Sequence, residues 1–111
     1  MAFVEGNQDG VTNGATAVTA VSAPGSGVRR IITTLFIVNV DTVNGTLTVR
    51  VNRAAGTIRR IEPAFVMTAN QVWRLGSPIV LDATDEVLEI LLGGAVTTNE
   101  WEFHASYGDA S

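Results

Sequence analysis

Residues 28–53 read VRRIITTLFIVNVDTVNGTLTVRVNR and carry the clearest structural signal in the chain. More than half of them are Val, Ile or Thr, and β-branched side chains favour extended backbone. Toward the end of the stretch the pattern alternates, so that Leu47, Val49 and Val51 fall on one face of a strand and polar side chains on the other. The stretch therefore predicts two β-strands, of which the second is half-buried.

Turn-forming residues divide the whole chain into segments of this kind. They recur at intervals of roughly ten to twenty residues, which is a spacing typical of strands and hairpins. Together with abundant Val and Thr, this spacing predicts an all-β protein, an antiparallel, jelly-roll-like β-sandwich of about eight strands. We expect residues 1–22 to form an N-terminal arm and first strand that can reach a neighbouring subunit, and residues 23–111 to form the sandwich domain.

Glycine-containing turns predict which strands are neighbours. Asn44-Gly45 suits a type I′ turn, so we expect the strands on either side of it to be hairpin partners. Gly93-Gly94 predicts the same for the last two strands. In the last strand the apolar side chains alternate with polar ones, which predicts a half-buried strand with Trp101 in the core; the apolar set is Trp101, Phe103, Ala105 and Tyr107.

The segment from Asp82 to Leu92 fits two kinds of structure. As a helix, it would begin with a capping box at Asp82 and end before Gly93. As a strand, it would place Leu88, Ile90 and Leu92 inward. We favour the strand because its neighbours are strands and a lone short helix is marginal.

The strand from Ile31 to Val40 is apolar on both faces. Strict alternation puts one set of apolar side chains on one face and a second set on the other; the first set is Ile31, Leu35 and Ile37, and the second is Ile32, Phe36, Val38 and Val40. A two-layer sandwich buries only one face of each sheet. The second face must therefore be covered by a loop, a terminal arm or another subunit.

Composition excludes several classes of chemistry. The chain has no Cys, no Lys and a single His, so thiolate, Schiff-base and Ser-His-Asp mechanisms have little support and we expect no enzyme activity. Its net charge of −4 is the wrong sign for nucleic-acid binding, and no apolar run is long enough to span a membrane. We expect no cofactor and no metal, because the acidic sets are better explained as solvated side chains; these sets are Glu100, Glu102 and His104, and Asp82, Asp85 and Glu86.

Two Arg doublets and two Trp residues are the remaining candidates for specific contacts. Arg29-Arg30 and Arg59-Arg60 each open or interrupt an apolar strand. They either protect a sheet edge by charge or meet carboxylates on a partner through bidentate contacts. Trp73 can be a core residue or an interface anchor. The candidate interface combines residues from the N-terminal arm, the doubly apolar strand and the Arg doublets with Trp73. It is Phe3, Val4, Arg29, Arg30, Ile32, Phe36, Val38, Arg59, Arg60 and Trp73.

Four segments read together resemble a family of virion proteins. They are APGSGVRRIITTLFIVNVDTVNGTLTVRVNR (residues 23–53), RRIEPAF (59–65), NQVWRLGSPIVLDATDEVLEILLGG (70–94) and ASYGD (105–109). The order of a P-x-G turn, an R-I-I-T strand, an N/D-T-rich hairpin, a P-I-V-L strand and a D-x-L-E strand is similar to that of small β-sandwich proteins from tailed-phage virions. The resemblance covers residues 23–109 and rests on turns and strand alternation.

The resemblance implies a structural role in the particle. It suggests a capsid decoration (cement) protein that binds the major capsid protein and itself, as a homotrimer, on the outer surface of the virion after synthesis in the host cytoplasm. A tail, collar or fibre-base subunit is the structural alternative. A host-adhesion or carbohydrate-binding sandwich is a third possibility, and it would be expected to expose an aromatic platform.

Overall fold

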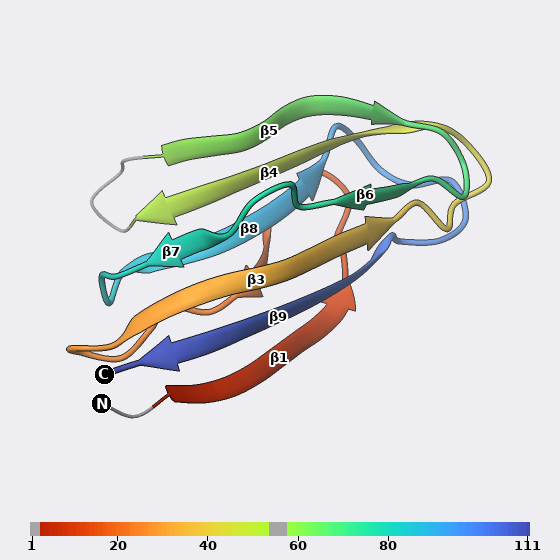
Figure 1. Cartoon of the computed structure of the whole chain (residues 1–111). Helices are drawn as coiled ribbons and strands as arrows, with labels where there is room; N and C mark the ends of the chain where they lie inside the picture. The colour runs from red at the N-terminus through yellow and green to blue at the C-terminus, as the bar shows by residue number, and fades with distance from the viewer. Residues whose placement is uncertain (1–2, 54–57) are drawn as a thin grey trace.

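The computed structural model describes residues 3–53 and 58–111, and within these ranges the chain forms nine β-strands and no helix (Figure 1). The strands are β1 (Phe3–Val11), β2 (Val18–Val21), β3 (Arg29–Val38), β4 (Gly45–Arg53), β5 (Ile58–Met67), β6 (Val72–Arg74), β7 (Ile79–Leu81), β8 (Glu86–Leu92) and β9 (Glu102–Ala110). No helix in the described part of the chain is long and apolar enough to cross a membrane. The all-β prediction is confirmed.

Two antiparallel sheets pack against each other. The first sheet has the order β1-β9-β3-β6, and β7 also pairs with β3, beyond the end of β6. The second sheet has the order β2-β8-β4-β5. If β6 and β7 are counted as one interrupted strand, this is the two-sheet, eight-position order of a jelly roll. The predicted jelly-roll-like sandwich is therefore correct.

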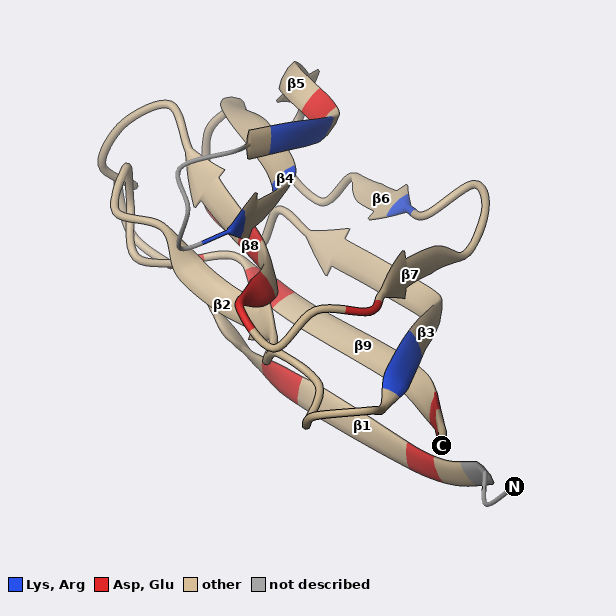
Figure 2. Ribbon diagram, turned by 90° about the vertical axis from the view of Figure 1, so that its left-hand side faces the viewer, with Lys and Arg blue, Asp and Glu red and all other residues tan. Residues whose placement is uncertain are grey.

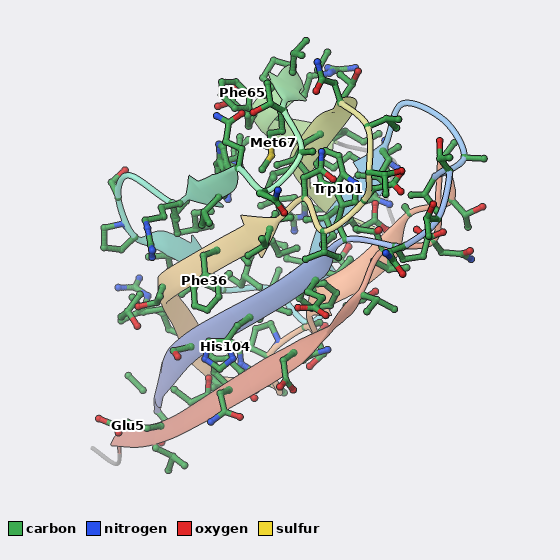
Figure 3. All side chains as sticks on the ribbon, turned by 90° about the vertical axis from the view of Figure 1, so that its right-hand side faces the viewer. Glu5, Phe36, Phe65, Met67, Trp101 and His104 are labelled. Atoms are coloured by element: carbon green, nitrogen blue, oxygen red, sulfur yellow. The ribbon has the colours of Figure 1, made fainter. Side chains whose placement is uncertain are left out.

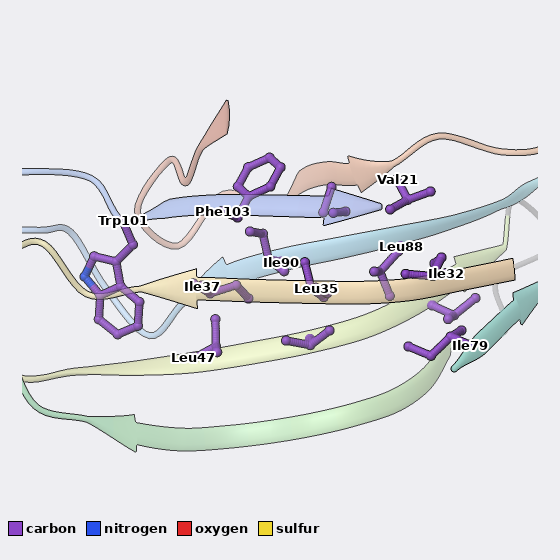
Figure 4. Close-up of a cluster of buried hydrophobic side chains, with 14 of the residues drawn as sticks. Val21, Ile32, Leu35, Ile37, Leu47, Ile79, Leu88, Ile90, Trp101 and Phe103 are labelled. Carbon is purple, nitrogen blue, oxygen red and sulfur yellow. The ribbon is translucent and has the colours of Figure 1, made fainter. Parts of the chain in front are cut away.

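The core lies between the two sheets and is formed by the alternating positions that the sequence indicates (Figure 4). Leu47, Val49 and Val51 of β4 are buried, as predicted. Their neighbours on β8 are Leu92, Ile90 and Leu88, so the strand prediction for this segment is confirmed as well. From the other sheet, Phe103 and Ala105 of β9 are buried, and Trp101 just before β9 is 1% exposed.

A bulge in β3 corrects the prediction for its two faces. Its register against β9 shifts between Ile32 and Thr34, so strict alternation fails there. Ile32, Leu35 and Ile37 consequently all point into the core and are buried. Ile32 was expected on the interface face with Phe36, and it is instead fully buried within the chain, 0% exposed.

The two predicted hairpins are wrong, because in each case the chain changes sheet at the turn. β3 belongs to the first sheet and β4 to the second, so Asn44-Gly45 closes a crossover and neither residue has a positive φ. β8 and β9 are likewise in different sheets. Asn-Gly supports a hairpin turn only where the next strand stays in the same sheet, and local sequence does not contain that information.

Gly45 is needed for close packing. A Cβ at this position would lie 2.6 Å from Cζ2 of Trp101. We predict that Gly45→Ala lowers the free energy of unfolding by about 1–3 kcal/mol, the usual cost of overpacking. Urea unfolding measures this, with Gly76→Ala as the control because nothing lies within 4 Å of a Cβ there. Equal effects of the two substitutions would contradict the argument.

Residues 3–21 belong to the same sandwich. β1 pairs along its whole length with β9, from Phe3 opposite Ala110 to Val11 opposite Glu102. β2 pairs with β8 in the other sheet. The start of β1 and the end of β9 therefore lie side by side at one end of the sandwich (Figure 1). Contact of this segment with a neighbouring subunit stays a prediction.

Candidate interaction surfaces

The outer face of the first sheet is partly apolar. Beyond the bulge, Phe36 and Val38 of β3 point away from the core, because Ile37 between them is buried. The register aligns each of them with one residue on β1, β9 and β6. We call these eight residues the outer face: Asp9, Val11, Phe36, Val38, Val72, Arg74, Glu102 and His104.

Side chains on the outer face contact one another across strands. The rings of Phe36 and His104 lie 5.4 Å apart between centroids, and Figure 3 shows them on neighbouring strands. On the other side of β3 from His104, the guanidinium carbon of Arg74 lies 5.7 Å from the centre of the Phe36 ring. A shallow hollow of about 490 Å³ lies over this region. Val11 is 54% exposed and Val72 is 39% exposed, so apolar area reaches solvent here.

A groove runs along one open side of the sandwich. It lies between β5, the edge strand of the second sheet, and β6 and β7, which form the edge of the first sheet. Its volume is about 620 Å³. Apolar residues from both sheets contribute to its lining, among them Ile61, Trp73 and Leu75. The indole Nε1 of Trp73 donates a hydrogen bond of 3.1 Å to Oε1 of Glu62, which ties the two walls of the groove together. We call this feature the mouth groove.

Uncompensated positive charge collects near the mouth groove. Three of the seven Arg side chains form ion pairs, namely Arg30 with Asp109, Arg50 with Glu89 and Arg53 with Asp85. Within residues 3–53 and 58–111, the other four have no ion pair, and three of these four lie on β5 or β6 (Figure 2); they are Arg59, Arg60 and Arg74. In a chain of net charge −4, this edge is locally positive.

Arg30 makes its bidentate contact inside the chain. Its Nε and Nη2 donate to the two carboxylate oxygens of Asp109 at 2.8 and 2.9 Å, and Nη1 donates to the Ser22 carbonyl at 2.9 Å. The guanidinium also lies 4.2 Å from the centre of the Tyr107 ring. The hydrogen bonds from Arg30 lower the pKa of Asp109, and those to Asp109 raise the pKa of Arg30. Arg30 therefore ties β3, β9 and the end of β2 together.

The structure separates the predicted interface residues into groups. Phe36 and Val38 meet on the outer face, whereas Arg59 and Trp73 line the mouth groove, with Arg60 beside it on β5. The others lie elsewhere. Val4 on β1 and Arg29 on β3 are exposed, Ile32 is core, Arg30 is engaged with Asp109, and the side chain of Phe3 is outside the described part of the chain.

The expectation that the acidic sets are solvated is wrong for Glu86 and Glu100, whose carboxylates are bonded within the chain. Glu100 precedes β9 rather than sharing a strand face with Glu102, and its Oε1 accepts hydrogen bonds from Thr12 Oγ1 at 2.9 Å and from Gly14 N at 2.8 Å. Oε1 of Glu86 accepts from the backbone N–H groups of Asp82 and Ala83 and closes the turn before β8. In the part of the chain that the structure describes, no three His, Asp or Glu side chains are grouped to hold a metal ion.

A buried polar hub at the β3–β4 crossover is absent from the sequence-based expectations. Asp41 is 4% exposed and its carboxylate accepts four backbone N–H groups, from Thr42, Thr97 and Thr98 at 2.8 Å and from Asn99 at 3.2 Å. These hydrogen bonds, with that from Thr97 contributing most, lower the pKa of Asp41 to about 2. The usable signal was an Asn-Val-Asp sequence at the end of an apolar strand, since buried polar residues must find partners.

Comparisons with known proteins find a similar fold in structures of a virus and its particles. No protein-family model matches the chain, and no curated protein matches it in sequence. The structure of infectious bursal disease virus, Gx strain, matches 97% of this chain with a TM-score of 0.58 and 15% identity. The T13 particle of the same virus matches 96% with a TM-score of 0.60 and 13% identity. A mutant VP2 protein of that virus, in T=1 particles, matches 97% of this chain with a TM-score of 0.57 and 14% identity.

This chain spans only part of those proteins, covering between 30% and 32% of their length. The capsid asymmetric unit of cyanophage Pam1 gives a TM-score of 0.47 at 14% identity, a similarity too weak to establish a common fold. At these identities, the matches to the bursal disease virus show that the two-sheet fold is shared.

Proposed function

We propose that this chain is a structural protein of a virus particle, and specifically a capsid decoration (cement) protein of a tailed phage that binds the major capsid protein on the outer surface of the head. The observation that carries the proposal is the mouth groove with its uncompensated Arg side chains. A groove that combines apolar side chains with Arg side chains that form no ion pair among the described residues, on an otherwise acidic chain, suits a partner surface that is partly apolar and acidic.

Three further features support a role in assembly. The fold is shared with segments of proteins found in virus particles. Large apolar side chains are exposed across the molecule, as expected for a surface that other proteins cover; those in the described residues are Val4, Val11, Val43, Ile58, Val66, Val72 and Val80. The homotrimer that the family resemblance implies is part of this proposal, and it would place copies at three-fold positions of the capsid lattice.

The carbohydrate-binding alternative is less well supported by the geometry. Such a site stacks a sugar on an exposed aromatic face. Trp73 is the aromatic residue of the mouth groove, yet it is only partly exposed and its N–H is already donated to Glu62. A tail or collar role uses the same kinds of contact as a head role, so position on the particle separates these two.

Labelling with gold-conjugated antibody on intact particles tests the location. We expect label over the whole head and a copy number in the hundreds per particle, as a lattice of sites requires. Label confined to the tail or collar, with one or two rings of copies, would contradict decoration and would establish the structural alternative.

Binding to shells that lack the protein tests the mouth groove. We expect the pair of substitutions Arg59→Glu and Arg60→Glu to weaken binding by on the order of tenfold or more, because like charges then face an acidic partner. Arg29→Glu is the control, since Arg29 is also exposed and without an ion pair in the described residues but lies on β3, away from the groove. Equal binding by all variants would mean that another surface meets the shell.

A further inference from the structure

The outer face of the first sheet has its charges in a definite order. One row across the sheet reads Asp9, His104, Phe36 and Arg74, on β1, β9, β3 and β6 respectively. Neighbouring strands are about 4.8 Å apart, so the acid and the Arg are at opposite ends of the row with two rings between them. The row is acidic on the β1 side and basic on the β6 side.

The adjacent row contains one acid and has apolar residues at both ends. It reads Val11, Glu102, Val38 and Val72, again on β1, β9, β3 and β6. All of these side chains point away from the core, because Phe103 and Ile37, which lie between the two rows on β9 and β3, are buried. The acids Asp9 and Glu102 thus lie toward one flank of the face and the single Arg toward the other.

Such an order is complementary to itself. A two-fold axis parallel to the strands, passing between β9 and β3, brings a second copy face to face with the first and reverses the order of its strands. β1 then lies over β6 of the second copy, and β9 over β3. Each row faces its own copy, so Asp9 meets Arg74 of the second copy, and the reverse contact occurs at the other end. This is the isologous arrangement that a two-fold interface requires.

The central residues match in the same way. Phe36 meets His104 of the second copy, which extends the ring contact already present within each chain at 5.4 Å. Val11 meets Val72 of the second copy, and both are among the exposed large apolar side chains. Glu102 lies one strand and one row from Arg74 of the second copy, within reach of the long guanidinium side chain. The hollow of about 490 Å³ over this face would be filled by the facing side chains.

We propose that two copies of this chain pair through the outer face, about a two-fold axis, with Asp9 and Arg74 forming reciprocal ion pairs around an apolar centre. The pairing follows from charge order and exposed apolar area on the first sheet, whereas shell binding is tested at Arg59 and Arg60 of β5. Arg74 also lines the mouth groove, and Asp9, which does not, keeps the two proposals separable. It is also distinct from a three-fold contact, which joins two different surfaces.

The mass of the purified protein in solution is the first test. We expect sedimentation or native mass spectrometry to give a dimer, or a hexamer if two-fold and three-fold contacts coexist. A monomer at tens of micromolar, or a trimer without higher species, would overturn the pairing. Neither measurement involves particles, so its outcome is independent of where the protein is located on a virion.

Charge exchange is the second and sharper test. Arg74→Glu places two acids opposite each other at both ends of the interface, and Asp9→Arg does the same with two Arg side chains. Each is expected to raise the dimer dissociation constant by on the order of tenfold or more. The double variant with both substitutions restores opposite charges and should pair nearly as tightly as the original chain. High salt should weaken the original dimer and the double variant alike.

Two further variants complete the design. Arg60→Glu makes the same change in net charge on the other sheet and should leave the dimer intact. Phe36→Asp should give a folded, soluble monomer by circular dichroism and sedimentation, because Phe36 lies outside the core. The pairing is wrong if Arg74→Glu and Arg60→Glu have the same effect on the dissociation constant, or if the double variant is no tighter than the single ones.

Discussion

Replacing Trp101 with Ala should remove about 3–5 kcal/mol from the free energy of unfolding, the loss expected when a large buried aromatic side chain is truncated. The indole is 1% exposed and packs against Gly45, where no side chain could be accommodated. In Figure 4 it lies beside Ile37 and Leu47, at the end of the core where the chain crosses between the sheets. Truncation would leave a cavity at this end of the core, which adds to the loss of apolar contact.

Urea unfolding followed by circular dichroism measures the loss, and the chain supplies its own control. Trp73→Ala removes the same side chain from the edge of the core, where Trp73 is only partly buried. Its expected cost is smaller, because water already reaches part of the indole and less apolar contact is lost. A loss for Trp101→Ala no larger than that for Trp73→Ala would show that the crossover end of the core relaxes around the cavity.

Asp41→Asn should destabilise the protein and also change how its stability depends on pH. The carboxylate accepts four backbone N–H groups across its two oxygens, and Oδ2 takes the one from Thr97. An amide cannot accept with both of its ends, so at least one of these N–H groups would lose its acceptor. The loop before β9 would then be less firmly held to the crossover before β4.

The direction of the pH effect follows from the pKa of Asp41, which is lowered from 3.8 to about 2 in the folded chain. A carboxyl whose pKa is lower in the folded state stabilises that state fully above its unfolded pKa. The contribution therefore disappears as the pH falls from 3.8 toward 2. In thermal unfolding between pH 2 and 7, the Tm of the original chain should fall more steeply below pH 4 than that of Asp41→Asn.

Asp82→Asn provides the control for the substitution, because Asp82 is an exposed carboxyl before β8 that accepts none of these hydrogen bonds. It should leave the Tm at pH 7 nearly unchanged. Parallel curves for the original chain and Asp41→Asn below pH 4 would mean that the acid sensitivity arises from other carboxyls, of which Asp109, with its lowered pKa, is the first to examine.

Alternation within strands was predictable because the pleat of a β-strand sends successive side chains to opposite faces. That rule correctly placed Leu47, Val49 and Val51 in the core, and it did the same for Trp101 and Phe103. It failed in β3, where one bulge exchanged the faces of Ile31 and Ile32 relative to Phe36. A bulge adds one residue without a composition signal, so regular alternation cannot detect it.

Pairing between strands was less predictable, because a turn sequence does not say which sheet the next strand joins. Asn44-Gly45 looks like a hairpin turn, yet its glycine is explained by the indole of Trp101, which comes from a residue far along the chain. The role of the Arg29-Arg30 doublet was similarly undecided by the sequence. Its bidentate partner, Asp109, lies at the other end of the sequence, and only the pairing of β3 with β9 brings the two together.

Fold class and the inward positions of most strands could be predicted, since both depend on local propensity and on a period of two residues. Composition alone also excluded thiol and lysine chemistry. Which candidate residues are available to a partner became clear only in the folded chain. Ile32 and Arg30 are engaged within the chain, whereas Phe36, Arg59 and Trp73 lie on two separate surfaces. The reason is physical: exposure and charge pairing depend on contacts between strands that are distant in sequence, and register sets those contacts.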